Sequence, residues 1–436
     1  MLENKRKDKH NMKVLIQNGY VLDPESKREG VFDVLVEDDK IVKVAENISD
    51  SADRIIDATG AYVMPGFIDL HVHLRDPGLE YKETLETGGK AAARGGVTTV
   101  CAMPNTKPVT DNAEMINAIH ERAKTECPVN VIQIGAITIG QMGNELADIA
   151  GMAKAGCHAI SEDGKSVMNA SLYRQAMKIA KENDISIFAH CEDITMVEGG
   201  VMHADDKAKA LGLKGITNAV EDVIVARDIM LSRDTGARLH LCHCSTKDSV
   251  TMVKLAKEEG LRVSAEVCPH HFVLTSEDIP SAEDTDYKMN PPLRAREDVE
   301  ALKAGLRDGI MDVIATDHAP HSFEEKNTTM KKAPFGIVGL ETAACLTYTE
   351  LVKGGYLTPM QMVEKMSYNP ARIIGIDKGD ISEGKIADIV IFNPNETYTI
   401  DKNEFASKGK NTPFHGREVT GRVCATLVNG KVVYER

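Results

Sequence analysis

Short hydrophobic runs interrupted by polar turn residues characterise both ends of the chain. Residues 13–23 (KVLIQNGYVLD) are divided by Asn18-Gly19, and residues 32–46 (FDVLVEDDKIVKVAE) are divided by Asp38-Asp39. Near the other end, Asn429-Gly430 separates two similar runs. Such pairs between apolar runs are typical of strands joined by hairpin turns. We therefore expect β-rich segments at both ends, assembled into one small β-sandwich.

The middle of the chain has a different pattern, in which short apolar segments alternate with stretches of helix-forming residues. Residues 83–96 (ETLETGGKAAARGG) and 113–126 (AEMINAIHERAKTE) are two such stretches. The apolar segments that we expect to be strands are Pro65–Leu70, Val97–Met103, Val129–Ile134, His158–Ser161, Ile185–Ala189, Ala237–Cys242, Arg262–Val267 and Asp312–Thr316. This alternation predicts an α/β protein with a (β/α)8 TIM-like barrel.

The predicted organisation has four parts. Residues 1–11 form a disordered tail or an extension, and residues 12–64 form the first part of the β-sandwich. The barrel occupies residues 65–370, and residues 371–436 complete the sandwich. In such barrels the active site lies at the carboxyl ends of the strands, so reactive side chains are expected there. Those that follow the predicted strands are His71, His73, Asn105, Asp163, His190, His243, Asn290 and Asp317.

His71 and His73 are two residues apart at the end of the first predicted strand. Residues i and i+2 of a strand face the same way, so both imidazoles can point at one ion. Imidazole is a good ligand for Zn²⁺ and similar divalent ions. A chance pair of surface histidines is the commoner explanation of this spacing alone, but it becomes weaker as further ligand types follow other strands.

Each of those further residues also has an ordinary interpretation. Asp163 in SEDG suits a solvated turn, and His190 and His243 suit buried core histidines as well as ligands. Asp317 is more informative, because a carboxylate ending an apolar strand is costly unless a cation pairs with it. Together, four histidines and two aspartates are too many for one tetrahedral ion and suit two ions about 3.5 Å apart.

Neighbouring residues fit a metal site less well. His240 has the opposite strand parity from His243, so we expect it to support rather than ligate. Cys242 and Cys244 lack a second cysteine pair nearby and are better interpreted as buried thiols. For the histidines after Asp317, we expect His321 to contact substrate and His318 to be supporting or structural.

Composition narrows the classes of function. The chain has 436 residues, with 52 Lys and Arg against 66 Asp and Glu, which gives a net charge of −14. This acidic balance disfavours nucleic-acid binding as the main task. No apolar run approaches the ~20 residues that a membrane span needs. The amino-terminal residues have no secretory pattern, and the nine cysteines show no disulfide spacing, so we expect reduced thiols and a cytoplasmic location.

Several motifs together resemble the dihydroorotases of the barrel amidohydrolase superfamily, from about Lys13 to Arg436. They are MPGFIDLHVHLRDPG, GGVTTVCAMPNTKP, SEDG, AHCED, CHCST, KMNPPLR, ATDHAPH and KKAPFGIVGLET. The resemblance implies the fold predicted above. It also implies the branch in which an aspartate, rather than a carbamylated lysine, bridges two zinc ions. Lys165 does not match the lysine position of the other branch, and Cys244 departs from the aliphatic residue more usual in the family.

The resemblance also implies a role for each site residue. It places His71, His73 and Asp317 on one zinc ion, His190 and His243 on the second, and Asp163 between them. Asp317 is also implied as the general acid and base. The implied substrate contacts are His73, Arg75, Asn105, Asn290, His321 and the backbone around Phe335 and Gly336.

The implied reaction is the reversible cyclisation of N-carbamoyl-L-aspartate to L-dihydroorotate and water, the third step of pyrimidine synthesis, through a zinc-activated water. Arg75 suits a substrate carboxylate, although a surface salt bridge with Asp76 or Glu80 is its alternative, and a turn is the alternative for Asn105. The competing functions are another cyclic amidohydrolase (dihydropyrimidinase, hydantoinase or allantoinase) and a non-catalytic assembly subunit. We expect a small-molecule substrate and a homodimer, and a carbamoyltransferase is a candidate partner. The polar segment at residues 322–332 is either a solvated loop or a segment that orders over the substrate.

Overall fold

The computed structural model describes residues 11–436. Apart from Asn11, the predicted tail at residues 1–11 lies outside the described part of the chain. Among the described residues, no helix combines the length and apolar character needed to cross a membrane.

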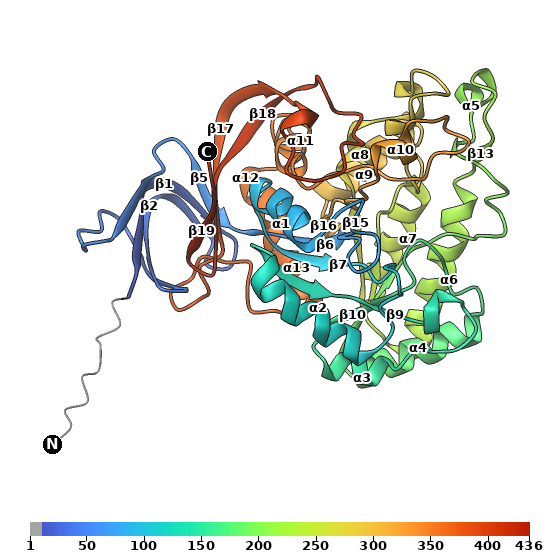
Figure 1. The fold of residues 1–436 in the computed structure, drawn as a ribbon, viewed down its shortest axis with the longest axis horizontal. Coiled ribbons are helices and arrows are strands. Elements are labelled where there is room, and N and C mark those ends of the chain that lie inside the picture. The colour runs from blue at the N-terminus through green and yellow to red at the C-terminus, as the bar shows by residue number, and fades with distance from the viewer. Residues whose placement is uncertain (1–10) are drawn as a thin grey trace.

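Strands from both ends of the chain form one mixed sheet, with the order β19-β18-β17-β5-β1-β2-β3 and with β4 paired to β1. Figure 1 shows these first and last strands (blue and red) side by side at one end of the molecule. The antiparallel pairing of β5 with β17 joins the two ends. The strands are β1 (Lys13–Asp23), β2 (Arg28–Glu37), β3 (Lys40–Ala45), β4 (Arg54–Asp57), β5 (Tyr62–Pro65), β17 (Ile389–Thr399), β18 (Glu418–Val428) and β19 (Lys431–Glu435).

The hairpin predicted at Asn18-Gly19 is wrong, whereas turns are present at Asp38-Asp39 and at Asn429-Gly430. Strand β1 continues through Asn18, and its pairing with β2 shifts register between Ile16 and Gly19, which is a β-bulge. Asn18 has φ 63°, and its N–H donates to Asp33 Oδ1 at 2.9 Å. A residue with positive φ suits a bulge as well as a turn, so the dipeptide alone did not distinguish the two.

The middle of the chain contains parallel strands in two sheets, β6-β7-β8 and β9-β10-β11-β14-β15-β16. These strands are β6 (Phe67–Val72), β7 (Val97–Ala102), β8 (Asn130–Gln133), β9 (Gly135–Ala136), β10 (Ala159–Ser161), β11 (Ser186–Ala189), β14 (Leu239–Leu241), β15 (Val263–Val267) and β16 (Val313–Ile314). The predicted parallel α/β region is therefore confirmed. The third predicted strand is β8, and Ile134 alone separates it from β9 in the second sheet. A parallel bridge between Val72 and His318 links the two sheets at their other edges.

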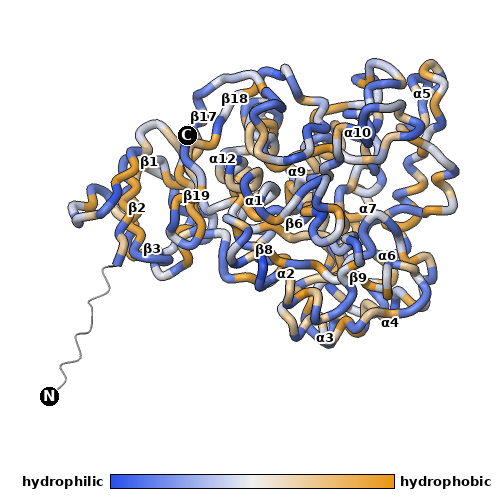
Figure 2. Tube along the Cα trace, viewed as in Figure 1, coloured by the Kyte–Doolittle hydropathy of each residue, from blue (hydrophilic) through white to orange (hydrophobic). Residues whose placement is uncertain are grey.

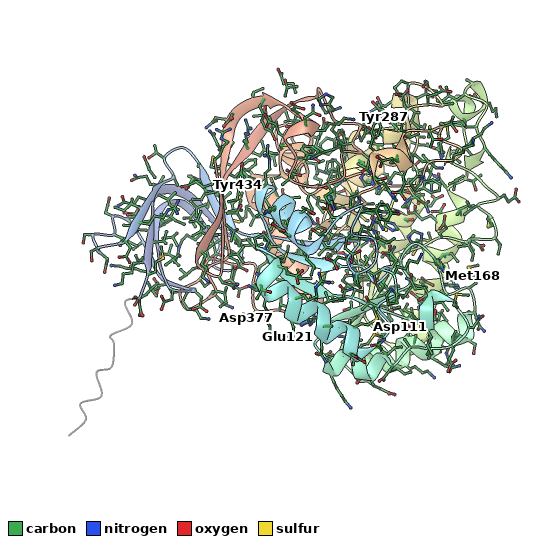
Figure 3. The ribbon with its side chains drawn as sticks, viewed as in Figure 1. Asp111, Glu121, Met168, Tyr287, Asp377 and Tyr434 are labelled. Carbon is green, nitrogen blue, oxygen red and sulfur yellow. The ribbon has the colours of Figure 1, made fainter. Side chains whose placement is uncertain are left out.

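Helices alternate with these strands and surround them (Figure 1). The longer ones are α1 (Leu85–Arg94), α2 (Ala113–Glu126), α3 (Ile149–Lys154), α4 (Ala170–Glu182), α6 (Ala219–Thr235), α7 (Lys247–Glu258), α9 (Arg296–Arg307) and α13 (Asn369–Ile374). Local sequence sets where they begin: the side chains of Thr84 and Asn112 accept hydrogen bonds from backbone N–H groups in the first turns of α1 and α2. Figure 3 shows Glu121 on the outer side of α2 and Tyr434 on β19.

Short elements lie in the connections. They are α5 (Asp206–Ala210), α8 (Pro269–Val273), α10 (Phe323–Lys326), α11 (Ala343–Thr347), α12 (Pro359–Val363), β12 (Met202–His203), β13 (Gly215–Ile216), η1 (Ile139–Gln141), η2 (Ser276–Asp278), η3 (Thr285–Tyr287), η4 (Tyr348–Val352), η5 (Glu364–Tyr368) and η6 (Lys402–Glu404). Segment 322–332 thus contains the helical turn α10. Lys326 anchors that turn, because its buried ammonium donates to the carbonyls of Thr285 at 2.9 Å and Pro334 at 3.0 Å.

The buried apolar side chains of the described residues form four clusters, of which the largest lies between the parallel strands and their helices and the second lies under the terminal sheet. Figure 2 shows hydrophobic segments along the strands and hydrophilic segments along many outer connections. Burial of apolar surface holds the parallel strands in place. Their carboxyl ends, where the chain turns polar, are thereby brought into one region.

Candidate metal centre

Six side chains from five separate parts of the chain converge at the carboxyl ends of the parallel strands. Asp163 lies at the middle of this group, within 4 Å of all four histidines. Its carboxylate oxygens lie 3.1 Å from His71 Nε2, 3.4 Å from His73 Nε2, 3.6 Å from His190 Nδ1 and 3.9 Å from His243 Nε2. The solvated turn considered for Asp163 is therefore wrong, because the side chain is only 4% exposed.

Asp317 completes the group from the side of the last strand. Its Oδ1 lies 3.0 Å from His73 Nε2 and 3.5 Å from His71 Nε2. His190 Nδ1 and His243 Nε2 lie 2.9 Å apart on the other side of Asp163. The three-residue groups His71–His73–Asp163, His71–His243–Asp317 and Asp163–His190–His243 each have the spacing of a metal site.

The backbone at two of these positions has an unusual conformation. His243 has φ 34° and Asp317 has φ 47°, and Arg75 nearby in the sequence has φ 61°. Residues with side chains enter this left-handed region at a cost in free energy, and such strain concentrates at functional sites. The conformation turns the chain sharply directly after a strand, which aims the side chain at the group rather than along the strand.

The charges in the group stabilise one another. Burial acts to raise the pKa of Asp163, but the adjacent His71 and His73 outweigh it and hold that pKa well below its usual value. Burial likewise acts to raise the pKa of Asp317, and the same two histidines lower it. Both carboxylates are therefore kept ionised, as ligands for a cation must be.

Glu266 supports the group from β15 and was not found from the sequence. Its carboxylate accepts from His71 Nδ1 at 2.9 Å, from His240 Nε2 at 2.8 Å and from the backbone N–H of His243 at 3.1 Å. Burial acts to raise the pKa of Glu266, but the bonds from His240 and His71 lower it well below its usual value. The only sequence signal was a carboxylate within the apolar strand SAEV, and the supporting role expected for His240 agrees with its contact.

Glu192 supports His190 in the same manner. Its Oε2 lies 3.1 Å from His190 Nε2, and its Oε1 accepts from Asn290 Nδ2 at 2.9 Å. Carboxylates that hold the outer nitrogen of a metal-binding histidine fix the orientation and tautomer of the ring. Asn290, predicted to contact substrate, is thus tied to the group through Glu192.

The structure excludes the salt bridge that was the alternative for Arg75. Asp76 pairs instead with Arg122 at 2.7 Å, and Glu80 accepts from the backbone of Gly78 at 2.7 Å. Arg75 is buried and donates from Nε to the Pro320 carbonyl at 3.3 Å. Within residues 11–436, no carboxylate forms an ion pair with it, so a buried positive charge stands beside the group.

Asn105 also contacts the group rather than stabilising a turn. Its amide donates to Asp163 Oδ2 at 3.1 Å, and its Oδ1 lies 2.9 Å from His73 Nδ1. Both ends of the amide therefore bind predicted ligands. A contact of Asn105 with substrate stays a prediction.

His321 is held in a fixed orientation by the loop around it. Its Nε2 lies 2.8 Å from the Phe335 carbonyl, and its Nδ1 lies 3.2 Å from Lys82 Nζ. Burial, with the positive charges of Arg75 and Lys82, lowers the pKa of His321 to about 2, so the ring is neutral. Gly336 approaches the ring so closely that an added Cβ would lie 2.7 Å from His321 Cδ2. His318 points elsewhere, to Glu83 at 3.2 Å.

Comparison with known proteins gives a consistent picture. A family model described as dihydro-orotase-like matches residues 60–249. The dihydroorotase of Pelotomaculum thermopropionicum is 50% identical over 97% of this chain and 99% of its own length. That of Acetivibrio thermocellus is 48% identical over 96% of this chain and 98% of its own length.

Solved structures agree on the fold. An L-hydantoinase (dihydropyrimidinase) from Arthrobacter aurescens matches with a TM-score of 0.85 at 29% identity, over 97% of this chain and 96% of that chain. A dihydropyrimidinase from Brevibacillus agri has the same TM-score at 26% identity, over 97% and 95%. From the near-complete match to relatives of this identity, we conclude that the chain belongs to the dihydroorotase family.

Proposed function

We propose that this protein is a dihydroorotase that reversibly closes N-carbamoyl-L-aspartate to L-dihydroorotate and water, in pyrimidine synthesis. The observation that carries this proposal is the buried cation Arg75 beside a cluster of four histidines and two aspartates. The relatives at 45–50% identity, all described as dihydroorotases, support the same activity.

We further propose that the parallel strands close into a (β/α)8 barrel and that the terminal strands form a separate β-sandwich, within the boundaries predicted above. The Val72–His318 bridge and the single residue between β8 and β9 support closure. A closed barrel would explain why residues as distant as His71 and Asp317 meet at one rim.

The side chains present fit a divalent metal centre. His71 Nε2 is buried and has no hydrogen-bond partner among the described residues, although Asp163 Oδ1 lies 3.1 Å away. His190 Nδ1 and His243 Nε2 face each other, and two lone pairs so placed suit a shared cation. Mixed imidazole and carboxylate ligands favour Zn²⁺ or a similar ion.

In our proposal, His71, His73 and Asp317 would hold one zinc ion, His190 and His243 would hold a second, and Asp163 would be a ligand of both. Zinc in such a site supplies polarisation of an amide carbonyl and lowers the pKa of water towards neutrality. The Asp-bridged arrangement needs no carbamylated lysine. It rests on the central position of Asp163 among the four histidines.

The chain's own groups move the proton. Asp317 accepts a proton from the attacking water in the hydrolytic direction and returns it to the leaving amide nitrogen as the ring opens. In the direction of ring closure, the same carboxylate takes the proton from the nitrogen and gives it to the departing hydroxide, which leaves as water, as microscopic reversibility requires. His73 Nε2 lies 3.0 Å from Asp317 Oδ1, so these two proposed ligands of the first zinc ion are adjacent.

Arg75 selects the substrate. Its planar guanidinium suits a carboxylate, which dihydroorotate carries and dihydrouracil lacks. His73, Asn105, Asn290, His321 and the backbone of Phe335 and Gly336 are proposed to position the ring. A homodimer, association with a carbamoyltransferase, and a cytoplasmic location remain predictions.

A second candidate function is a hydantoinase or dihydropyrimidinase, because the matching solved structures carry those names. Turnover of dihydroorotate, dihydrouracil, hydantoin and allantoin by one preparation separates them. We expect dihydroorotate to be preferred. A preference for an uncharged ring would overturn the proposal.

The metal requirement is tested by assaying dihydroorotate turnover before chelation, after chelation, and after zinc is added back. We expect activity to be lost and then recovered. A non-catalytic assembly subunit would purify without stoichiometric metal and show no turnover in any of the three states.

A further inference from the structure

A second group of metal-binding side chains takes no part in the proposed reaction. Cys268, His270 and His271 follow β15 directly, within and just before the short helix α8. They are 0%, 1% and 1% exposed. The sulfur and one nitrogen of each imidazole all lie within 4.8 Å of one another.

The contact of the outer nitrogen of His271 identifies the tautomer of that ring. Its Nε2 lies 2.8 Å from the Pro291 carbonyl, which only accepts hydrogen bonds, so Nε2 carries the proton. A second proton on Nδ1 would be an unpaired charge in the interior. Nδ1 therefore presents a lone pair, and it has no hydrogen-bond partner among residues 11–436.

His270 leaves a second buried nitrogen unpaired. Its Nε2 also has no hydrogen-bond partner in the described part of the chain, and its ring centroid lies 4.3 Å from that of His271. Buried polar atoms without partners are rare in folded proteins and call for an explanation. His271 donates its outer N–H to a backbone carbonyl while its other nitrogen stays free, which is the usual arrangement of a metal-binding histidine.

We propose that Cys268, His270 and His271 bind a further cation of the zinc class, separate from the six-residue centre. One thiolate and two imidazoles are the ligands that such ions prefer. Zn²⁺ bonds of about 2.0–2.3 Å place tetrahedral ligands about 3.3–3.8 Å apart, so small side-chain shifts would bring these three donors, which lie within 4.8 Å of one another, to that spacing. The thiol proton is released to solvent when the ion binds.

The test is a titration of the chelated full-length protein with Co²⁺, because a thiolate ligand adds a charge-transfer absorption band in the near ultraviolet. Cys242 is the matched control, since it lies with His71 and Glu266 in another group of metal-binding spacing. We expect the band in the unmodified protein and in Cys242→Ser, and its loss in Cys268→Ser. Cys268→Ser should also bind one equivalent of metal less than the unmodified protein.

Absence of the band, or its loss in Cys242→Ser with retention in Cys268→Ser, would overturn the proposal. His271→Gln provides a second variant that keeps both thiols, and it should also bind one equivalent less; an unchanged stoichiometry contradicts the site. Circular dichroism identifies a variant that has not folded. X-ray absorption of the zinc-loaded unmodified protein needs no variant: sulfur scattering is expected, and neighbours of nitrogen and oxygen alone would exclude the site.

Discussion

At the scale of a residue, the buried charge of Arg75 is the basis of our proposed choice of substrate. Arg75→Gln keeps a side chain of similar length but removes the charge that we propose faces the substrate carboxylate. Because charged hydrogen bonds contribute about 1.5–3 kcal/mol, we expect KM for dihydroorotate to rise about 10- to 100-fold. Turnover of dihydrouracil should change little. Equal loss for both substrates would contradict the assignment. Arg75→Lys keeps the positive charge but removes the planar guanidinium, so it tests whether paired hydrogen bonds to the carboxylate are needed.

Asp317 is the residue on which proton transfer depends in our proposal. Asp317→Asn keeps the shape of the side chain and removes its ability to take a proton. We expect kcat to fall about 10²- to 10⁴-fold, the usual contribution of a general acid or base. Steady-state kinetics measure the change, with metal analysis to check occupancy. Activity close to that of the unmodified enzyme would exclude this role.

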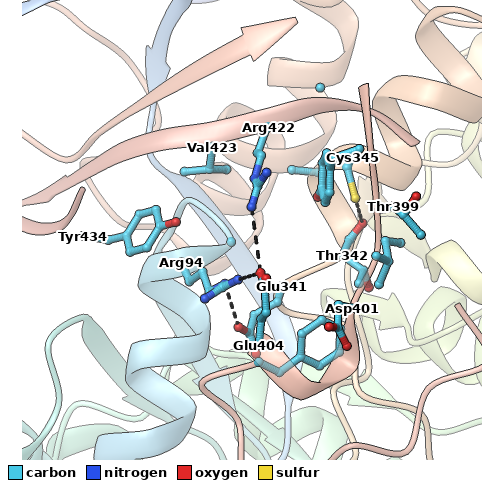
Figure 4. A pocket seen from close by; sticks show the side chains of 16 residues that line it. Arg94, Glu341, Thr342, Cys345, Thr399, Asp401, Glu404, Arg422, Val423 and Tyr434 are labelled. Carbon is cyan, nitrogen blue, oxygen red and sulfur yellow. Dashed lines mark hydrogen bonds and ion pairs between the residues drawn. The ribbon is translucent and has the colours of Figure 1, made fainter. Parts of the chain in front are cut away.

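Glu341 lies away from the metal centre, and its burial should make the stability of the protein depend on pH. It lines a pocket with Arg94, Glu404 and Arg422 (Figure 4), and Arg94 Nε lies 3.3 Å from its carboxylate. Burial nevertheless raises its pKa from 4.5 to about 7. The folded protein thus keeps a proton that the unfolded chain has already lost, so the free energy of unfolding should decrease as pH rises from 4.5 to about 7 and then level off.

The size of this decrease is on the order of 3 kcal/mol if Glu341 alone is responsible. Glu341→Gln cannot ionise, so its stability should depend less on pH across that interval. Urea unfolding at several pH values measures the difference. Parallel curves for the two proteins would show that Glu341 does not carry the effect.

At the scale of elements, β15 supports β6 and β14 through Glu266, which binds His71, His240 and the backbone of His243. Glu266→Gln should weaken metal binding about 10- to 100-fold, as loss of supporting carboxylates does elsewhere. Competition with a chelator measures the affinity. Glu277→Gln, at an exposed position, is the control. Equal affinity in both variants would refute the supporting role.

The elements themselves were largely predictable. All eight predicted strands are present, with ends within two residues of the predicted ones, because a buried strand between helices needs an unbroken apolar run. The Asn-Gly pairs were less informative: the pair at 429–430 is a turn and the pair at 18–19 is a bulge. The difference depends on what pairs with each strand, and no local pattern contains that.

At the scale of the whole molecule, the carboxyl-terminal part of the chain supports the loop that contains Ala319, His321 and Gly336. Asn411 donates to the carbonyls of Ala319 and Gly336, each at 2.9 Å, and accepts from the backbone of His321 at 3.1 Å. Asn411→Ala removes three buried bonds, so we expect stability to fall by about 2–4 kcal/mol and kcat/KM to fall with it.

Denaturant unfolding and steady-state kinetics check both effects. Asn403→Ala is the control, because Asn403 is exposed and bonds only to its neighbour Asp401 among the described residues. If Asn411→Ala behaved like Asn403→Ala, the loop would not depend on this contact.

Sequence alone determined the alternation of strands and helices and the residue types able to hold a metal, because periodicity and donor chemistry are local properties. It also indicated the family, through motifs close to those residues. Only the tertiary structure decided between alternatives for single side chains. From the sequence, Asp163 could lie in a solvated turn and Arg75 could form a surface salt bridge. In the structure both side chains are buried, and Asp76 pairs with Arg122 instead. Glu266 became visible only there, because its partner His71 is distant along the chain, and the unpaired buried nitrogens of His270 and His271 became visible only with packing.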